Sequence, residues 1–328
     1  GFLGGQLTKQ THMFFGSTDQ FAGIRGIDIA TKLVEEIEGH PRIQVLKRAT
    51  VAGIYPDGVV TISQGKRFLK YKPNRIVVAT GAVEKMLGFP HNDLPGICGA
   101  GGVQTLMNLY GVLPGNEVVM VGAGNIGLIV SYQLMQAGVT VKAILEAAPS
   151  IGGYLVHAAK VRRMGVPILT RHTVKEAYGK ECLEGVVIHR LDEQWQPVPG
   201  SEQDLSCDVL CLSVGLSPLS DILWQAGCRM EWVPELGGHV AIRNQNLETT
   251  VQGLYLAGDV AGVEEASSAM VEGTLAGYCA AESLGYRPEG LEEKKQKARL
   301  DLEELRAGHA GEKLRAGLKR VVRETLPC

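Results

Sequence analysis

The sequence predicts an α/β protein, and two observations carry that prediction. The apolar run 118–121 leads directly into the glycine turn Gly122-x-Gly124-x-x-Gly127, and a helical apolar pattern and a second apolar run, 139–145, follow it. The chain also repeats itself: a strand, a small β-meander and a buried strand that ends in small residues occupy 43–81 and, in the same order, 166–215. Strands that alternate with helices favour a parallel sheet covered by helices.

The glycine turn has the layout of a dinucleotide-binding site. Gly122 allows the tight turn, Gly124 leaves space where a pyrophosphate approaches the backbone, and Gly127 lets the helix pack closely on the sheet. Asn125 and Ile126 open that helix, where unpaired N–H groups and the helix dipole favour an anion. A strand–helix turn that binds no ligand is the alternative interpretation.

Glu146 ends the second apolar run, 24 positions after Gly122. A carboxylate at this place can accept a hydrogen bond from a ribose 2′-hydroxyl. No Arg follows Glu146 closely, which favours NAD over NADP.

Composition limits the class of protein. The 328 residues, with 45% hydrophobic and 21% charged, suit a globular protein of two domains. A net charge of -2 argues against binding to nucleic acid, and no apolar run reaches the ~20 residues of a membrane span. No secretory signal begins the chain and its seven cysteines form no C-x-x-C, so we expect reduced thiols and a cytoplasmic location. The eight histidines are dispersed, and we expect no metal site.

The elements follow from local patterns taken in chain order. Apolar residues at helical spacing predict a helix over 30–37, and turn residues separate the β segments that we expect over 43–49, 50–55, 59–63, 68–71 and 76–81. A connector with a helix over 103–110 precedes the glycine unit. A helix over 157–164 and β segments over 166–169, 174–178, 183–191 and 209–214 follow it.

The last third of the chain holds one more strand and three helices. A buried strand over 254–260 ends in Gly258-Asp259, and a helix with a small-residue face starts near 264. Residues 286–328 are rich in Lys, Arg and Glu with a Leu/Val periodicity, which predicts a pair of surface helices without a catalytic role.

The two repeats differ at their beginnings. A complete glycine unit precedes the second repeat, whereas the first has only Gly4-Gly5, which corresponds in kind to Gly152-Gly153. We therefore expect a first strand, glycine turn and helix of about 35–40 residues to be missing, because a βαβ unit takes ~30 residues.

Five motifs stand in a recognisable order: Gly4-Gly5-Gln6, Ala79-Thr80-Gly81, the Gly122 turn, 214–218 (VGLSP) and Ala257-Gly258-Asp259. Over about residues 1–285 they resemble the two-dinucleotide-binding-domain flavoproteins of the pyridine nucleotide–disulfide oxidoreductase superfamily. Residues 5–12 (GQLTKQTH), 94–96 (LPG) and 103–106 (VQTL) are similar to the α subunits of sarcosine oxidase, dye-linked L-proline dehydrogenase, opine oxidase and hydrogen cyanide synthase.

This resemblance implies two Rossmann-like domains, one inserted in the other. An FAD-binding domain would be split over 1–110 and 216–285, an NAD(P)-binding-type domain would occupy 111–215, and 286–328 would be a helical extension. The FAD domain would lack its N-terminal glycine fingerprint in this chain.

The resemblance also implies contacts with FAD. Gly4, Gly5 and Gln6 would lie near the pyrophosphate and ribityl chain, and Thr50 or Val51 would offer backbone groups to the adenine. Ala79, Thr80 and Gly81 would bound the site. Gly258 and Asp259 would hold the ribityl and pyrophosphate, and Ala266, at a helix N-terminus, would face the flavin pyrimidine edge.

The implied function is an FAD-dependent oxidoreductase, the α subunit of an amine or amino-acid dehydrogenase complex. Such an oligomer would include an electron acceptor and a substrate-binding partner subunit, with NAD(P) or another adenine nucleotide in the Gly122 site. An NAD(P)H-dependent flavin reductase acting alone and a non-catalytic nucleotide-binding subunit stay open as alternatives. Disulfide reduction is disfavoured because Cys98 stands alone, with no second Cys for a redox pair beside the flavin. No catalytic residue is assigned; Lys9 and His12 are candidates for the flavin pocket and His157 for the second nucleotide.

Overall fold

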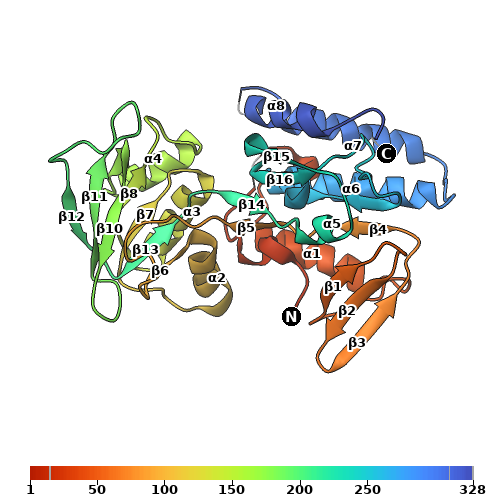
Figure 1. The fold of residues 1–328 in the computed structure, drawn as a ribbon, viewed down its shortest axis with the longest axis horizontal. Helices are drawn as coiled ribbons and strands as arrows, with labels where there is room; N and C mark the ends of the chain where they lie inside the picture. The colour runs from red at the N-terminus through yellow and green to blue at the C-terminus, as the bar shows by residue number, and fades with distance from the viewer. Residues whose placement is uncertain (15, 310, 327–328) are drawn as a thin grey trace.

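The computed structural model describes residues 1–14, 16–309 and 311–326, and it shows two lobes joined by a narrow waist (Figure 1). The left-hand lobe is built on a five-stranded parallel sheet with the strand order β6-β13-β7-β8-β9. These strands are Ile97–Gly99 (β6), Glu117–Val121 (β7), Thr140–Glu146 (β8), Ile168–Thr170 (β9) and Val209–Leu212 (β13). The predicted α/β class is confirmed.

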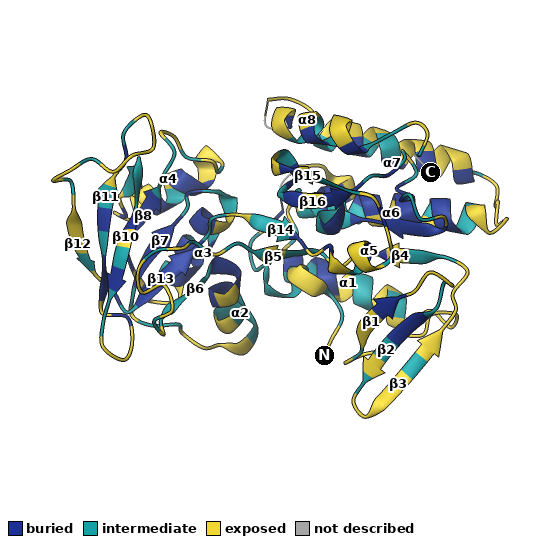
Figure 2. Ribbon diagram, in the orientation of Figure 1, coloured by how far each residue is buried: buried dark blue, intermediate teal, exposed yellow. Residues whose placement is uncertain are grey.

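Both faces of the parallel sheet are covered. The helices α2 (Ala100–Tyr110), α3 (Asn125–Gln136) and α4 (Leu155–Arg163) pack on one face. The antiparallel sheet of β10 (His172–Tyr178), β11 (Gly185–Arg190) and β12 (Gln203–Ser206) covers the other. Val118 and Met120 point to the helices, and Val119 and Val121 point to the antiparallel sheet. Consequently β7 is dark blue along most of its length in Figure 2.

The right-hand lobe has a smaller parallel sheet of two strands, β4 (Ile76–Val78) and β17 (Leu254–Leu256). Beside it lie the meander β1 (Thr50–Ile54), β2 (Val60–Gln64) and β3 (Arg67–Tyr71) and the hairpin β15 (Met230–Val233) and β16 (Gly238–Ala241). The helices of this lobe are α1 (Gly26–Glu38), α5 (Asp221–Gln225), α6 (Ala266–Ser283), α7 (Leu291–Leu305) and α8 (Glu312–Val321). Short 3₁₀ turns are η1 (Gly5–Lys9), η2 (Thr18–Gln20), η3 (Pro234–Leu236) and η4 (Gly258–Ala261).

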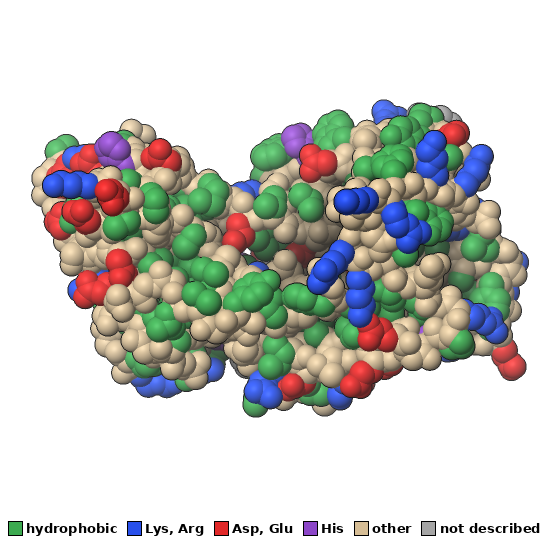
Figure 3. Space-filling model, turned by 90° about the horizontal axis from the view of Figure 1, so that it is seen from below, with side chains coloured by type: hydrophobic (Ala, Val, Ile, Leu, Met, Phe, Trp, Pro, Cys, Tyr) green, Lys and Arg blue, Asp and Glu red, His purple; other side chains and the backbone are tan. Residues whose placement is uncertain are grey.

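The chain crosses the waist twice. β5 (Ala82–Glu84) leads to the left-hand lobe and β14 (Leu216–Pro218) returns from it, and the two strands pair antiparallel. Figure 3 shows the waist from below, with Lys and Arg side chains around a hollow of the right-hand lobe. β6 and α2 lie in the left-hand lobe, because β6 pairs with β13, although they fall within the predicted domain 1–110. The division into domains otherwise stays a prediction.

Most predicted elements are present, including the meander and the two C-terminal helices, α7 and α8. One prediction is wrong: residues 43–49 form no strand. The reason is the absence of a neighbour, because β4 pairs only with β17 and no described residue supplies a strand for 43–49 to join. No helix in the described part of the chain is long and apolar enough to cross a membrane.

Candidate functional site

The Gly122 turn follows β7 at the carboxyl edge of the parallel sheet, where open α/β sheets bind their ligands. Gly122 has φ of 102°, and a Cβ there would lie 2.1 Å from the backbone oxygen of Ser213. A Cβ on Gly127 would lie 2.1 Å from the oxygen of Gly122, so the helix could not pack as closely. A Cβ on Gly124, in contrast, would meet no heavy atom within 4 Å. The open side of the turn is therefore at Gly124.

Two groups at this turn suit a nucleotide. Helix α3 begins at Asn125 with Gly124 as its N-cap and no side chain capping it, so the first N–H groups of the helix stay available to an anion. The Oε2 atom of Glu146 accepts a hydrogen bond from the N–H of Ala123 at 2.9 Å, and its Oε1 accepts one from the N–H of Ala148 at 2.9 Å. These bonds hold the carboxylate beside the turn, and each oxygen keeps a lone pair for a ribose hydroxyl.

A second group of predicted residues meets at the carboxyl edge of β4 and β17. Because these strands are parallel and in register, Ala79-Thr80-Gly81 and Gly258-Asp259 emerge side by side. Thr80 Oγ1 donates to the oxygen of Leu219 at 2.8 Å, which ties this edge to the segment that returns through the waist. Gly81 and Gly258 both have φ of 75°, the left-handed region that suits glycine.

The Gly258-Asp259 turn is held from behind by carboxylates. The N–H of Gly258 donates to Glu272 Oε2 at 2.8 Å, and the N–H of Glu264 donates to Asp259 Oδ1 at 3.3 Å. Arg306, the C-cap of α7, ion-pairs with Glu264 at 2.7 Å and with Glu272 at 2.6 Å. Burial raises the pKa of Asp259. The turn therefore offers a carboxylate in a poorly hydrated place, fixed by a network that reaches the C-terminal helices.

The N-terminal glycines lie on the turn η1, which contacts α1 and α2. A Cβ on Gly4, whose φ is 108°, would lie 2.6 Å from Thr8 Cγ2, whereas one on Gly5 would meet no heavy atom within 4 Å. Gln6 is exposed beside them, inside η1. Val51 is exposed on β1, which contacts α5.

The two sites are linked by one pair of residues that the sequence did not single out. Glu265 is the N-cap of α6, directly before Ala266, and its Oε1 accepts a hydrogen bond from Asn125 Nδ2 at 3.2 Å. Asn125 Oδ1 in turn accepts from the N–H of Tyr154 at 2.8 Å, and the Tyr154 hydroxyl is hydrogen bonded to Glu265. Burial raises the pKa of Glu265. The N-termini of α3 and α6 thus meet, while Ile126 stays partly exposed beside them.

The residues present fit both NAD(P) and FAD, and the two sites differ in one respect. On the NAD(P) side the open face at Gly124, the free helix N-terminus and Glu146 make a complete cradle. On the FAD side the open face at Gly5, the Gly258-Asp259 turn and the uncapped N-terminus of α6 fit the ribityl and flavin end. The described residues include no second Gly-x-Gly-x-x-Gly turn for the adenosine end.

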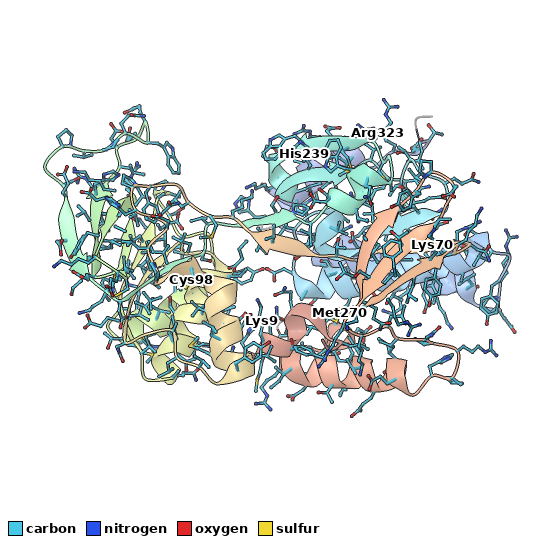
Figure 4. All side chains as sticks on the ribbon, turned by 60° about the horizontal axis from the view of Figure 1, so that its bottom comes forward. Lys9, Lys70, Cys98, His239, Met270 and Arg323 are labelled. Carbon is cyan, nitrogen blue, oxygen red and sulfur yellow. The ribbon has the colours of Figure 1, made fainter. Side chains whose placement is uncertain are left out.

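The three further candidates, Lys9, His12 and His157, occupy two different places in the structure. Lys9 donates from Nζ to the oxygen of Gly101 at 3.0 Å, and Figure 4 shows it between the lobes. His12 and His157 instead line one cavity of 380 Å³, together with Tyr132, Gln133 and Lys160. Burial lowers the pKa of His12 and of His157, so both are disfavoured as cations.

Cys98 does not stand alone. It lies opposite Cys211 in the register of β6 and β13, a proximity that sequence spacing could not reveal. Burial raises the pKa of both thiols, most strongly for Cys211. Since the thiolate is the reactive form, this pair is poorly suited to disulfide exchange.

Known proteins are similar to this chain in sequence. One opine oxidase subunit, from Agrobacterium tumefaciens (strain Ach5), is 28% identical over 234 residues, 69% of this chain and 46% of that protein. The alpha subunit of sarcosine oxidase from Corynebacterium sp. (strain P-1) is 27% identical over 293 residues, 83% of this chain and 29% of that protein. The chain therefore spans less than half the length of either relative.

Solved structures share the fold. T. acidophilum thioredoxin reductase matches with a TM-score of 0.68 at 20% identity, covering 86% of this chain and 88% of that one. L-proline dehydrogenase from P.horikoshii matches with a TM-score of 0.63 at 20% identity, covering 90% of this chain and 52% of that one. The model of the family described as pyridine nucleotide-disulphide oxidoreductase matches residues 7–273. The chain therefore belongs to the pyridine nucleotide-disulphide oxidoreductase family, whose members use FAD and NAD(P).

Proposed function

We propose that this chain is the FAD- and NAD(P)-binding α subunit of a complex that oxidises an amine or an amino acid. The oxidised substrate loses two electrons and two protons to become an imine. FAD supplies the chemistry, because it accepts a hydride equivalent and passes the electrons to an acceptor. The two relatives described above are by name subunits of oxidases that act on opines and on sarcosine.

One observation carries the proposal. The N-termini of α3 and α6 meet where Asn125 Nδ2 donates a hydrogen bond to Glu265 Oε1 at 3.2 Å. Both helix ends are uncapped by side chains, so both present N–H donors and a partial positive charge to the same region of the waist. A nucleotide on each glycine turn would therefore extend toward the other. This is the placement that electron or hydride traffic between two cofactors needs.

The residues have distinct proposed roles. Gly258 and Asp259 hold the ribityl chain, with Asp259 accepting a hydrogen bond from a ribityl hydroxyl, and Ala79, Thr80 and Gly81 close the neighbouring edge. Gly4, Gly5 and Gln6 bound the same cofactor, Val51 faces its adenine, and Ala266 presents the dipole of α6 to the flavin ring. Gly122, Gly124, Asn125, Ile126, Gly127 and Glu146 hold the second nucleotide.

A partner subunit has a suitable surface beside this region. Tyr154, Leu155 and Val156 begin α4 as three consecutive large side chains that are 46%, 78% and 48% exposed. Apolar runs this exposed are typical of protein–protein contacts. Because Tyr154 also binds Glu265, a subunit docked here would lie next to the junction of the two sites.

The test is a visible spectrum of the protein with its natural N-terminus, with and without the partner subunit. We expect a flavin band that an amine bleaches, without oxygen, only when the partner is present. The matched variant Leu155→Glu should weaken the complex and leave the flavin band of the free subunit unchanged. A flavin band that NADH bleaches in the isolated chain, and that an amine leaves unchanged even with the partner subunit, would contradict the proposal and favour a stand-alone flavin reductase. Nucleotide binding without any flavin band would favour the non-catalytic subunit.

A further inference from the structure

A cavity of 580 Å³ lies outside both nucleotide sites, among α6, α7, α8 and the segment 243–247. Its lining is strongly cationic. Six basic side chains contribute to it: Arg243, Arg299, Arg306, Arg315, Lys319 and Arg323. Three carboxylates line it as well: Glu272, Glu303 and Glu324. The lining residues therefore carry an excess of three positive charges.

Arg243 is the unusual member of this cluster. Its side chain is 1% exposed, and its Nε and Nη1 atoms find no hydrogen-bond acceptor in the described part of the chain. Its backbone is fixed, because its N–H donates to the oxygen of Val321 and its own oxygen accepts from the N–H of Arg323. A guanidinium out of contact with water normally has all its donors paired, since each unmet donor is costly.

The neighbouring cations are better paired than Arg243. Arg306 is paired on Glu264 and Glu272, and Arg315 donates to the backbone oxygens of Arg306 and Gly308. Arg299 donates from Nη2 to Asn246 at 2.8 Å, but its Nε is also buried without a partner. Two guanidinium groups of one cavity thus keep unmet N–H donors.

The carboxylate that faces Arg243 is already used. One carboxylate oxygen of Glu272 accepts a hydrogen bond from the N–H of Gly258, and the other accepts one from Arg306. Glu272 therefore attracts Arg243 by charge but accepts no hydrogen bond from it. Lys319 and Arg323 complete the cluster from α8 and the segment after it, and Figure 4 shows Arg323 at the upper side of the right-hand lobe. The cations come from four separate segments, so only the fold brings them together.

We propose that this cavity binds a small organic anion with at least two negative charges, whose oxygens accept from Arg243 and Arg299. Phosphate esters and di- or tricarboxylates share the required chemistry, because a planar guanidinium binds either group through paired N–H donors. The volume lies within the range of about 300–1,000 Å³ that small-molecule sites have. The site goes beyond the proposed function, since no residue assigned to FAD or NAD(P) contributes to it.

The site also has a defined relation to the flavin turn. Glu272 lies between Arg243 and the N–H of Gly258. An anion bound to Arg243 would therefore be separated from the Gly258 turn by a single side chain. The segment 243–247 and α8 line the cavity and contain none of the residues assigned to FAD or NAD(P). Their behaviour therefore reports on the anion alone.

The test is titration calorimetry at constant ionic strength on the whole chain saturated with NAD, using inorganic pyrophosphate and citrate as separate probes. We expect one-site binding of at least one probe, and its identity tells phosphate from carboxylate recognition. Arg243→Gln should weaken that binding at least tenfold. The matched control is Arg320→Gln, because Arg320 lies on α8 but pairs with Glu231 and Glu235 outside the cavity.

A second variant and a second method keep the proposal testable if Arg243→Gln does not fold. If Arg243→Gln does not fold, Lys319→Gln should still weaken binding severalfold with unchanged unfolding temperature. Amide hydrogen exchange should slow over 243–247 and 315–323 on binding; slowing only over 122–127 would place the probe in the nucleotide site and overturn the proposal. Binding of neither probe, or equal binding by Arg243→Gln and Arg320→Gln, would also overturn it.

Discussion

β13 and β4 are the corresponding strands of the two repeats, and they differ in what lies beside them. β13 pairs with β6 on one side and β7 on the other, in a sheet of five. β4 pairs with β17 alone, and Val77 in its middle is 43% exposed, whereas every residue of β13 is buried. Both strands end in a small-residue turn at the carboxyl edge. The turn therefore forms even where the sheet is incomplete. The strand before it, however, is fully buried only where it has a neighbour on each side.

This comparison separates two kinds of support for a nucleotide site. In the left-hand lobe the Gly122 turn is held by strands on both sides and by close backbone contacts at Gly122 and Gly127. In the right-hand lobe the Gly258 turn is held from behind by Glu272, Glu264 and Arg306. The first site depends on packing of the backbone, and the second depends on buried charge. Each dependence can be broken separately.

The largest effect should come from removing the buried charge behind the Gly258 turn. Arg306→Met leaves Glu264 and Glu272, which are 5% and 2% exposed, without their partner, and we expect a loss of about 3–5 kcal/mol in the free energy of unfolding. Urea unfolding measures it. The control is Lys297→Met on α7, the helix that Arg306 caps; the pairs of Lys297 with Asp19 and Asp301 are at the surface, and their loss should cost less than about 1 kcal/mol. Equal losses in the two variants would mean that the network behind the turn carries no special stability.

The backbone support of the Gly122 turn is tested by two alanines. Gly122→Ala places a Cβ 2.1 Å from a backbone oxygen at a φ of 102°, and we expect a loss of about 3 kcal/mol in stability. Gly124→Ala meets no atom, so the unfolding temperature should stay within a few degrees while NAD binding falls at least tenfold. Thermal unfolding and calorimetry separate the two outcomes. A Gly124→Ala chain that binds NAD normally would place the pyrophosphate elsewhere.

Much of the fold and of the Gly122 site could be predicted from short stretches of sequence. The Gly-x-Gly-x-x-Gly spacing with Glu146, the meander and the amphipathic C-terminal helices are patterns within short windows, and the structure has them where the sequence places them. The strand over 43–49 failed because β propensity is realised only beside a partner strand. The corresponding strand of the second repeat, β9, does form, because β8 lies next to it.

The remaining features depend on residues far apart in the chain. Cys98 meets Cys211, Asn125 meets Glu265, and Arg243 is enclosed by α7 and α8 only after folding. No spacing rule connects such residues. The one available signal was the position of Glu265 directly before a helix whose N-terminus was already assigned to the flavin.

A smaller effect should follow from the acid of the Gly122 site. Glu146→Gln replaces one accepting oxygen by an amide donor, which cannot accept from a ribose hydroxyl or from a backbone N–H. Loss of a charged hydrogen bond costs about 1.5–3 kcal/mol, so NAD should bind roughly 10- to 100-fold more weakly. Calorimetry with NAD and NADP checks it. The preference for NAD should fall as well; an unchanged ratio of the two affinities would remove Glu146 from the specificity of the site.

The smallest effect is the pH dependence of the acid at the other turn. Burial raises the pKa of Asp259 above its ordinary 3.8, so the folded chain holds this proton more tightly than the unfolded chain does. The free energy of unfolding therefore loses a contribution as pH rises from about 3.8 through the folded pKa, and the loss is complete above it. Asp259→Asn cannot lose a proton, and its Oδ1 can still accept from the N–H of Glu264. Without FAD, the stability of Asp259→Asn relative to the natural chain should rise over that pH range and then stay constant. Urea unfolding at a series of pH values measures this difference, and a flat difference would mean that Asp259 is well hydrated. We expect the same variant to retain FAD less well, because the proposed role of this buried carboxylate is to accept a hydrogen bond from the cofactor.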